Sequence, residues 1–153
     1  MIDKQYRLTK DGFEALETEL EKHEKRTKEV ADDIAVARQQ GDLSENAEYQ
    51  NAKDEQRKIQ HRIKEINTIL ASTEVVNEPD SNDEVVFGSE VKLSSGSSNV
   101  TYKVVGSLEA DPLEGKISDE SPIGQALLGA KENETVTIDL PAGSKQFTVE
   151  TIS

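Results

Sequence analysis

Two carboxylates three residues apart are the strongest candidates for chemistry in this sequence. Asp42 and Glu45 stand in the segment Gly41–Tyr49. On a helix, side chains three residues apart share a face at about 5–6 Å, close enough to hold one hard cation between them. Alternatively, these acids complement the dipole at a helix N-terminus, with Asp42 or Ser44 as the N-cap. Spacing alone leaves both interpretations open, and two ligands are too few for a self-sufficient magnesium site.

A repeating apolar pattern on both sides of this segment indicates how it is positioned. The repeat advances in alternating steps of three and four residues, as in a coiled coil, and a chain folded back near residue 43 places each position opposite another. The sequence therefore predicts an antiparallel two-helix coiled coil with the acidic pair at its tip. The facing pairs are Ala37 with Tyr49, Ile34 with Ala52, Val30 with Gln56, Thr27 with Ile59, His23 with Ile63, Leu20 with Ile66, Leu16 with Leu70 and Phe13 with Thr73.

Three polar side chains, His23, Thr27 and Gln56, interrupt this apolar seam. A functional interpretation would make His23 a switch or a ligand. We favour a polar layer that helps to fix the register of the two helices. His61 lies off the seam, and we expect it to be solvated.

The composition changes near residue 77. Residues 1–77 hold no proline and a net charge of −4, whereas residues 78–153 hold all four prolines and a net charge of −9. The second part has strand-like segments at 85–93, 100–105, 135–140 and 146–152, and a short helix at 121–129 that opens with serine and proline. We predict an α+β chain of two domains: a coiled-coil finger over 1–76, a linker over 77–83 and an antiparallel sheet with one short helix over 84–153.

Overall composition excludes several classes of function. The chain has 153 residues, a formal net charge of −13 and no cysteine, so it has no disulfide, thiolate metal site or cysteine nucleophile. The acidic balance argues against holding nucleic acid through its own phosphate contacts, so such a role would need a partner. Because no signal sequence or membrane-spanning stretch is evident, we expect a cytoplasmic protein without membrane contact.

The string Gly41-Asp42-Leu43-Ser44-Glu45-Asn46-Ala47-Glu48-Tyr49 resembles the coiled-coil tip of the bacterial Gre transcript cleavage factors, and most closely the GreA branch of that family. The resemblance extends over nearly the whole chain. It includes the segments 8–13, 87–91, 109–118 and 121–129. It implies that the second domain is FKBP-like and docks at the rim of the secondary channel of RNA polymerase, while the finger enters the channel.

The resemblance also implies roles for individual residues. Asp42 and Glu45 would complete the coordination of the second magnesium in the polymerase active site, so the factor would have no cofactor of its own and would not itself be an enzyme. The polymerase would then cut the 3′ end of nascent RNA in a backtracked complex, and elongation would resume. Candidate contacts to that RNA 3′ end are Arg38, Tyr49 and Lys53, and candidate polymerase-docking residues are Ser121, Pro122, Ile123 and Gly129.

Three alternatives remain at this point. A homologue could enter the same channel and inhibit the polymerase, although the intact pair Asp42 and Glu45 argues against this. An FKBP-like prolyl isomerase or chaperone would need an aromatic-lined pocket, and the second domain offers only Phe87, Tyr102 and Phe147. A coiled-coil scaffold would dimerise through the seam, whereas the mirrored pattern favours closure within one chain and a monomer.

Overall fold

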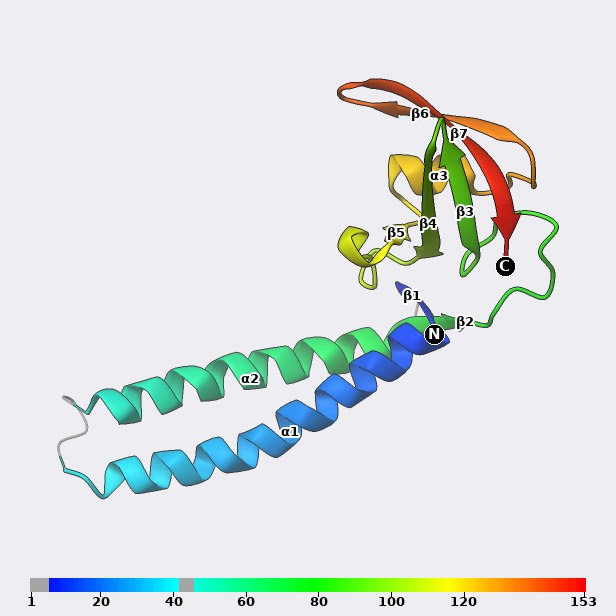
Figure 1. Cartoon of the computed structure of the whole chain (residues 1–153). Coiled ribbons are helices and arrows are strands. Elements are labelled where there is room, and N and C mark those ends of the chain that lie inside the picture. The colour runs from blue at the N-terminus through cyan, green and yellow to red at the C-terminus, as the bar shows by residue number, and fades with distance from the viewer. Residues whose placement is uncertain (1–5, 42–45) are drawn as a thin grey trace. The chain divides into compact units, whose positions relative to one another are not determined.

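The computed structural model describes residues 6–41 and 46–153 (Figure 1). These residues form two compact units, one made of residues 13–72 and the other of residues 6–12 and 73–153. The elements follow one another as β1 (Tyr6–Thr9), α1 (Lys10–Arg38), α2 (Ala47–Ala71), β2 (Thr73–Val76), β3 (Glu90–Ser95), β4 (Ser98–Val105), the 3-10 helix η1 (Pro112–Glu114), β5 (Lys116–Ser118), α3 (Pro122–Leu127), β6 (Thr135–Leu140) and β7 (Gly143–Ile152).

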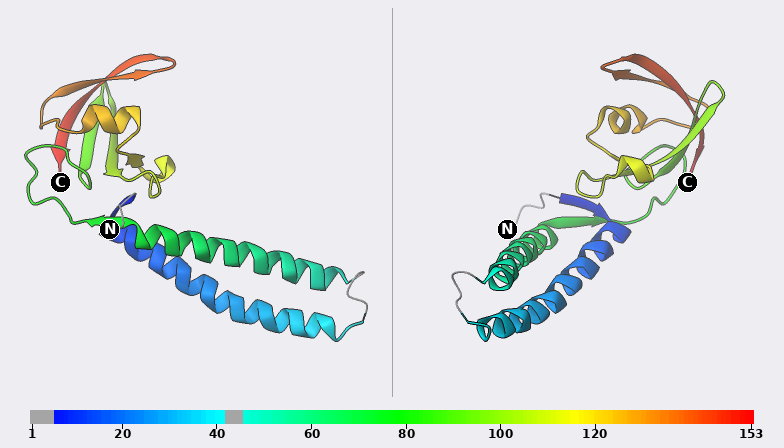
Figure 2. Two further views of the ribbon diagram at one scale, coloured as in Figure 1. Left: turned by 180° about the vertical axis from the view of Figure 1, so that it is seen from behind. Right: turned by 60° about the vertical axis from the view of Figure 1, so that its left-hand side comes forward.

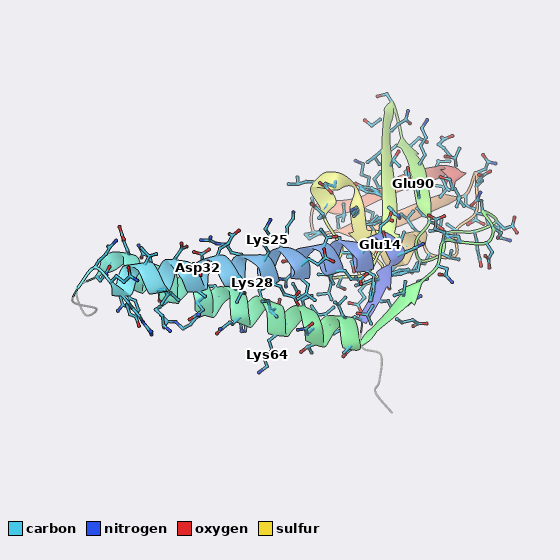
Figure 3. The ribbon with its side chains drawn as sticks, turned by 90° about the horizontal axis from the view of Figure 1, so that it is seen from below. Glu14, Lys25, Lys28, Asp32, Lys64 and Glu90 are labelled. Carbon is cyan, nitrogen blue, oxygen red and sulfur yellow. The ribbon has the colours of Figure 1, made fainter. Side chains whose placement is uncertain are left out.

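The helices α1 and α2 form an antiparallel hairpin, as the repeat predicts (Figure 1). Val30, Ile34, Ala52 and Ile59 pack together as the core of the hairpin, and Tyr49 and Ile63 lie partly buried against them. Every seam position in the two helices is buried or half-buried, while charged side chains such as Lys25, Lys28 and Asp32 extend from the surface of α1 (Figure 3). The narrow apolar stripe of each helix is therefore buried against the other helix.

Ion pairs flank the seam in a reciprocal arrangement. Arg62 of α2 donates from Nε and Nη2 to the two carboxylate oxygens of Glu19, at 2.8 and 2.9 Å. One heptad nearer the tip, Arg26 of α1 donates in the same way to Glu55, at 2.7 and 3.0 Å. Each helix thus contributes a glutamate followed by an arginine seven residues later. Both ion pairs form in the same alignment of α1 against α2.

The second unit is built on a curved five-stranded sheet with the strand order β5-β4-β3-β7-β6 (Figure 2). The pairs β3–β4, β3–β7 and β6–β7 are antiparallel, whereas β5 pairs with β4 in parallel. The sheet is therefore mixed, and only its short edge strand departs from the predicted antiparallel pattern. A parallel neighbour requires a crossover, which the segment between β4 and β5, including η1, supplies.

The core of this unit lies between the sheet and α3, which covers one face of the sheet (Figure 2). Ser121 caps α3 as predicted: its hydroxyl accepts a hydrogen bond from the Gly124 amide at 3.0 Å, and Pro122 takes the first helical position. The buried apolar side chains of the core are Val85, Val91, Leu93, Val104, Ile117, Leu127, Ala130, Ile138, Phe147, Val149 and Ile152.

A short parallel pair, β1 with β2, joins the segments that flank the helical hairpin. The sequence predicts both segments as part of the finger, whereas the structure groups them with the five-stranded sheet. Thr9 caps α1, because its hydroxyl accepts a hydrogen bond from the Gly12 amide at 3.2 Å. Glu109 secures this cap: its carboxylate accepts from the Thr9 amide at 3.1 Å and from the Thr9 hydroxyl at 2.6 Å.

Candidate functional site

The tip of the hairpin is framed by the end of α1 at Arg38 and the start of α2 at Ala47. Asp42 and Glu45, the predicted magnesium ligands, fall in the segment 42–45 and lie outside the described residues. Both are N-terminal to the first residue of α2. The structure therefore shows where the segment is anchored on either side, at Gly41 and Asn46.

Asn46 ties the two helices together next to this segment. Its side-chain oxygen accepts a hydrogen bond from the Tyr49 amide at 3.1 Å, so Asn46 is the N-cap of α2. Its side-chain nitrogen donates to the carbonyl of Ala37 in α1 at 2.8 Å. The alternative in which Asp42 or Ser44 caps the second helix is wrong, since Asn46 fills that position. This cap could have been recognised from the sequence, because asparagine is among the preferred N-cap residues.

The candidate RNA-contacting residues lie on both helices near the tip. The guanidinium carbon of Arg38 is 6.0 Å from the centre of the Tyr49 ring, a cation–π distance. Tyr49 also packs against the hairpin core. Lys53 is half-buried and donates to the side-chain oxygen of Gln56 at 3.2 Å. Arg38 and Tyr49 are thus in contact across the hairpin, and the Lys53 ammonium lies one turn further along α2.

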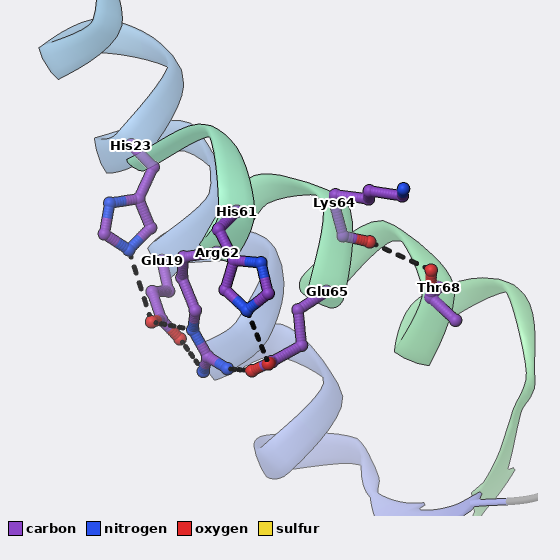
Figure 4. Close-up of polar contacts among 7 residues, drawn as sticks. All are labelled: Glu19, His23, His61, Arg62, Lys64, Glu65 and Thr68. Carbon is purple, nitrogen blue, oxygen red and sulfur yellow. Dashed lines mark hydrogen bonds and ion pairs between the residues drawn. The ribbon is translucent and has the colours of Figure 1, made fainter. Parts of the chain in front are cut away.

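Two cross-helix ion pairs shift the pKa values of their carboxyl groups, and Figure 4 shows the one between Glu19 and Arg62. The hydrogen bond from Arg62 is the main reason that the pKa of Glu19 is lowered, against the opposing effect of burial. Arg26 lowers the pKa of Glu55 in the same way. These two carboxylates stay charged in mildly acidic solution and hold the helices in register.

The two histidines differ as the sequence suggests. His23 is half-buried in the seam, with its Nε2 3.3 Å from an oxygen of Glu19 (Figure 4). Thr27, the next seam position, donates its hydroxyl to the His23 carbonyl at 2.8 Å, so this polar layer is internally satisfied. His61 has an 81% exposed side chain, 3.9 Å from Glu65, which confirms that it is solvated.

The candidate docking residues surround α3. Ser121 is half-buried and donates its hydroxyl to the carbonyl of Ser118 at 2.6 Å, and Pro122 is exposed. Ile123 packs against the core, and Gly129 adopts φ +85° beyond the end of the helix. The structure therefore places these residues in one short segment around α3, with Pro122 and Gly129 at the surface.

Within residues 6–41 and 46–153, no group of three or more histidine, cysteine, aspartate or glutamate side chains is arranged to hold a metal ion. The same part of the chain contains no helix of the length and apolar character needed to cross a bilayer.

Comparison with known proteins identifies the chain by both of its parts. Residues 6–75 match the family of transcription elongation factor N-terminal domains, and residues 80–153 match the C-terminal domain of transcription elongation factors GreA/GreB. A helical hairpin followed by a small mixed sheet is thus the class of two-domain transcription elongation factor that these families describe.

The chain belongs to the GreA/GreB family and is close to GreA. It is 44% identical to transcription elongation factor GreA of Roseiflexus castenholzii over 153 residues, covering 97% of this chain and 98% of that protein. It is 50% identical to GreA of Caldanaerobacter subterraneus over 141 residues, covering 89% of each chain. The crystal structure of GreA factor homolog 1 of Thermus thermophilus is 31% identical, with a TM-score of 0.44 over 96% of this chain and 97% of that one.

Proposed function

We propose that this chain binds bacterial RNA polymerase and stimulates the polymerase's own cleavage of the 3′ end of nascent RNA in backtracked complexes, so that elongation resumes. The hairpin of α1 and α2 enters the secondary channel, and the unit that contains α3 docks at the channel rim through Ser121, Pro122, Ile123 and Gly129. The observation that carries the proposal is a closed two-helix hairpin whose connecting segment contains Asp42 and Glu45, in a chain matched by both GreA/GreB families.

The donor chemistry of the tip is compatible with magnesium. Carboxylate oxygens are the ligands that this ion prefers, and two of them can supplement a site that already holds it weakly. Asp42 and Glu45 would be these ligands. A magnesium ion held there by Asp42, Glu45 and groups of the polymerase would supply an activated water molecule for hydrolysis of the RNA phosphodiester.

The remaining tip residues bind and orient the RNA. The Arg38 guanidinium, stacked near the Tyr49 ring, and the Lys53 ammonium supply positive charge for the displaced 3′ segment. Asn46 fixes the start of α2 against the end of α1, because its side chain is hydrogen-bonded to the Ala37 carbonyl and the Tyr49 amide. The factor is therefore a positioning device for an active site that belongs to its partner.

The decisive experiment adds the full-length protein to purified polymerase in a backtracked elongation complex. RNA labelled at its 5′ end should shorten, and the shortened RNA should then be extended when nucleotides are supplied. An inhibitory homologue would leave the RNA uncut and slow its extension, and a scaffold or isomerase would change neither. Uncut RNA in the presence of bound protein would overturn the proposal.

A further inference from the structure

The hairpin carries a shallow hollow on one side, between α1 and α2 near the tip, that the proposed function does not use. It is lined by Asp33, Val36, Glu48, Asn51, Ala52 and Glu55. Ala52 is buried and small, and forms part of the hydrophobic core below. Val36 is 56% exposed, the most exposed large apolar side chain in the described part of the hairpin.

All the charged residues that line the hollow are acidic, namely Asp33, Glu48 and Glu55. Glu55 and Asp33 both contact Arg26, at 2.7 and 3.4 Å, so a single guanidinium serves two of the three carboxylates. Glu48 has no ion-pair partner among the described residues. Asp32, labelled on α1 in Figure 3, lies one turn before Val36 but is not among the residues that line the hollow. The hollow therefore combines an exposed aliphatic side chain with unneutralised negative charge.

This combination selects one kind of ligand chemistry. Carboxylates repel the phosphates of RNA, so the hollow is unsuited to the nucleic acid that Arg38 and Lys53 would bind. A lysine or arginine side chain fits both parts, because its aliphatic stem packs on an apolar residue while its charged end pairs with carboxylates.

We propose that the hollow around Val36 is a docking surface for a basic polypeptide segment that lays an arginine or lysine side chain across Val36 toward Glu48. The proposal rests on the proposed function in one respect: the partner is RNA polymerase, at a place separate from the contacts of the tip and of α3. The hollow is thus an additional contact along the side of the hairpin, made through charge complementarity.

The test compares two variants with the same charge change on adjacent residues. Val36→Lys places a positive charge in the hollow, whereas Ala35→Lys, the control, places it at an exposed position about 100° around the same helix. Lysine is a good helix former, so neither variant should unfold the hairpin, and circular dichroism checks this. Since the chain has no cysteine, Ser153→Cys provides a single labelling site for a fluorescence anisotropy measurement of binding to core polymerase.

Val36→Lys should weaken binding about tenfold relative to Ala35→Lys. Val36→Ala, which improves helix propensity but removes apolar contact, should weaken it about threefold. Equal affinities for Val36→Lys and Ala35→Lys would overturn the docking surface and leave the proposed function standing. Tighter binding by Val36→Lys would show that the hollow faces an anion and would also overturn it. If the unsubstituted chain fails to bind polymerase, the proposed function itself is wrong.

Discussion

Glu109 and Gly12, 97 positions apart in the chain, are in such close contact that no side chain fits between them. A Cβ atom on Gly12 would lie 2.2 Å from Oε1 and 2.5 Å from Cδ of Glu109. Glycine at the third position of α1 therefore allows the Glu109 carboxylate to reach the Thr9 cap. The start of the helix is specified by a residue in the loop after β4.

Replacing Gly12 by alanine should destabilise the protein, although glycine to alanine within a helix normally stabilises by about 1 kcal/mol. The added methyl group displaces Glu109 and costs its charge-assisted hydrogen bonds, worth about 1.5–3 kcal/mol, so a net loss of about 1 kcal/mol is expected. Urea unfolding measures the change. In a Glu109→Ala background the obstacle is gone, and Gly12→Ala should then stabilise. A loss of stability in both backgrounds would refute this explanation.

Acid should weaken the hairpin through Glu19 and Glu55. Because arginine contacts lower the pKa of both carboxyl groups, the folded state binds fewer protons than the unfolded state in this range. Their stabilisation is fully present above the ordinary glutamate pKa and is lost as the pH falls through the lowered values. Helical circular dichroism during thermal unfolding should show this decline as the pH falls below the ordinary pKa of glutamate, about 4.3. The double variant Glu19→Gln, Glu55→Gln should have a flatter profile, and an unchanged profile would contradict the assignment.

Asn46 should contribute to stability through two separate bonds. Asn46→Ala removes both the cap of α2 and the bond to the Ala37 carbonyl, at an expected cost of about 1–2 kcal/mol. Asn46→Asp keeps the capping oxygen and loses only the donor to Ala37, so its cost should be smaller. Urea unfolding of the two variants separates these terms. If aspartate proves as costly as alanine, the cap contributes little.

The carboxylates at the tip should matter for cleavage and hardly for stability. Asp42→Asn and Glu45→Gln keep the shape of each side chain but replace a carboxylate with an amide, which is a poorer magnesium ligand. RNA cleavage in backtracked complexes should fall steeply for either variant and recover partly as magnesium is raised. Polymerase binding should persist. Variants that match the parent at limiting magnesium would show that the two acids are ordinary polar residues of the turn.

The long regular features could be predicted because each rests on local periodicity. The heptad steps located the helical hairpin, and the serine-proline start located α3. The hairpins β3–β4 and β6–β7 were also predicted, although the segment predicted as a strand over 85–93 forms β3 only from Glu90. Residues 85–89 instead form a turn in which the Ser89 hydroxyl accepts from the Val86 amide at 2.9 Å.

The features that escaped prediction depend on distant partners. The strands β1 and β2 have only four residues each, too few to show a recognisable pattern. They pair with one another although the whole helical hairpin separates them in the sequence. The parallel edge strand β5 has three residues. The carboxylate of Glu109 stands 100 positions from Thr9, and no local spacing marks it as a cap. At the tip, the candidate ligands Asp42 and Glu45 were predicted from the sequence. The two hydrogen bonds of Asn46, which link α2 to α1 beside them, are seen only in the structure.

The reciprocal ion pairs have a consequence for assembly. On α1 alone, Glu19 and Arg26 have the spacing needed to pair with the same two residues of a second α1 in antiparallel orientation. In that alignment the apolar positions also meet, Leu16 with Ile34 and Leu20 with Val30. These ion pairs and apolar contacts alone would therefore also fit a second copy of α1. The discrimination comes from the short connection between α1 and α2, which holds the correct partner at an effective concentration of about millimolar, far above that of a second molecule in dilute solution.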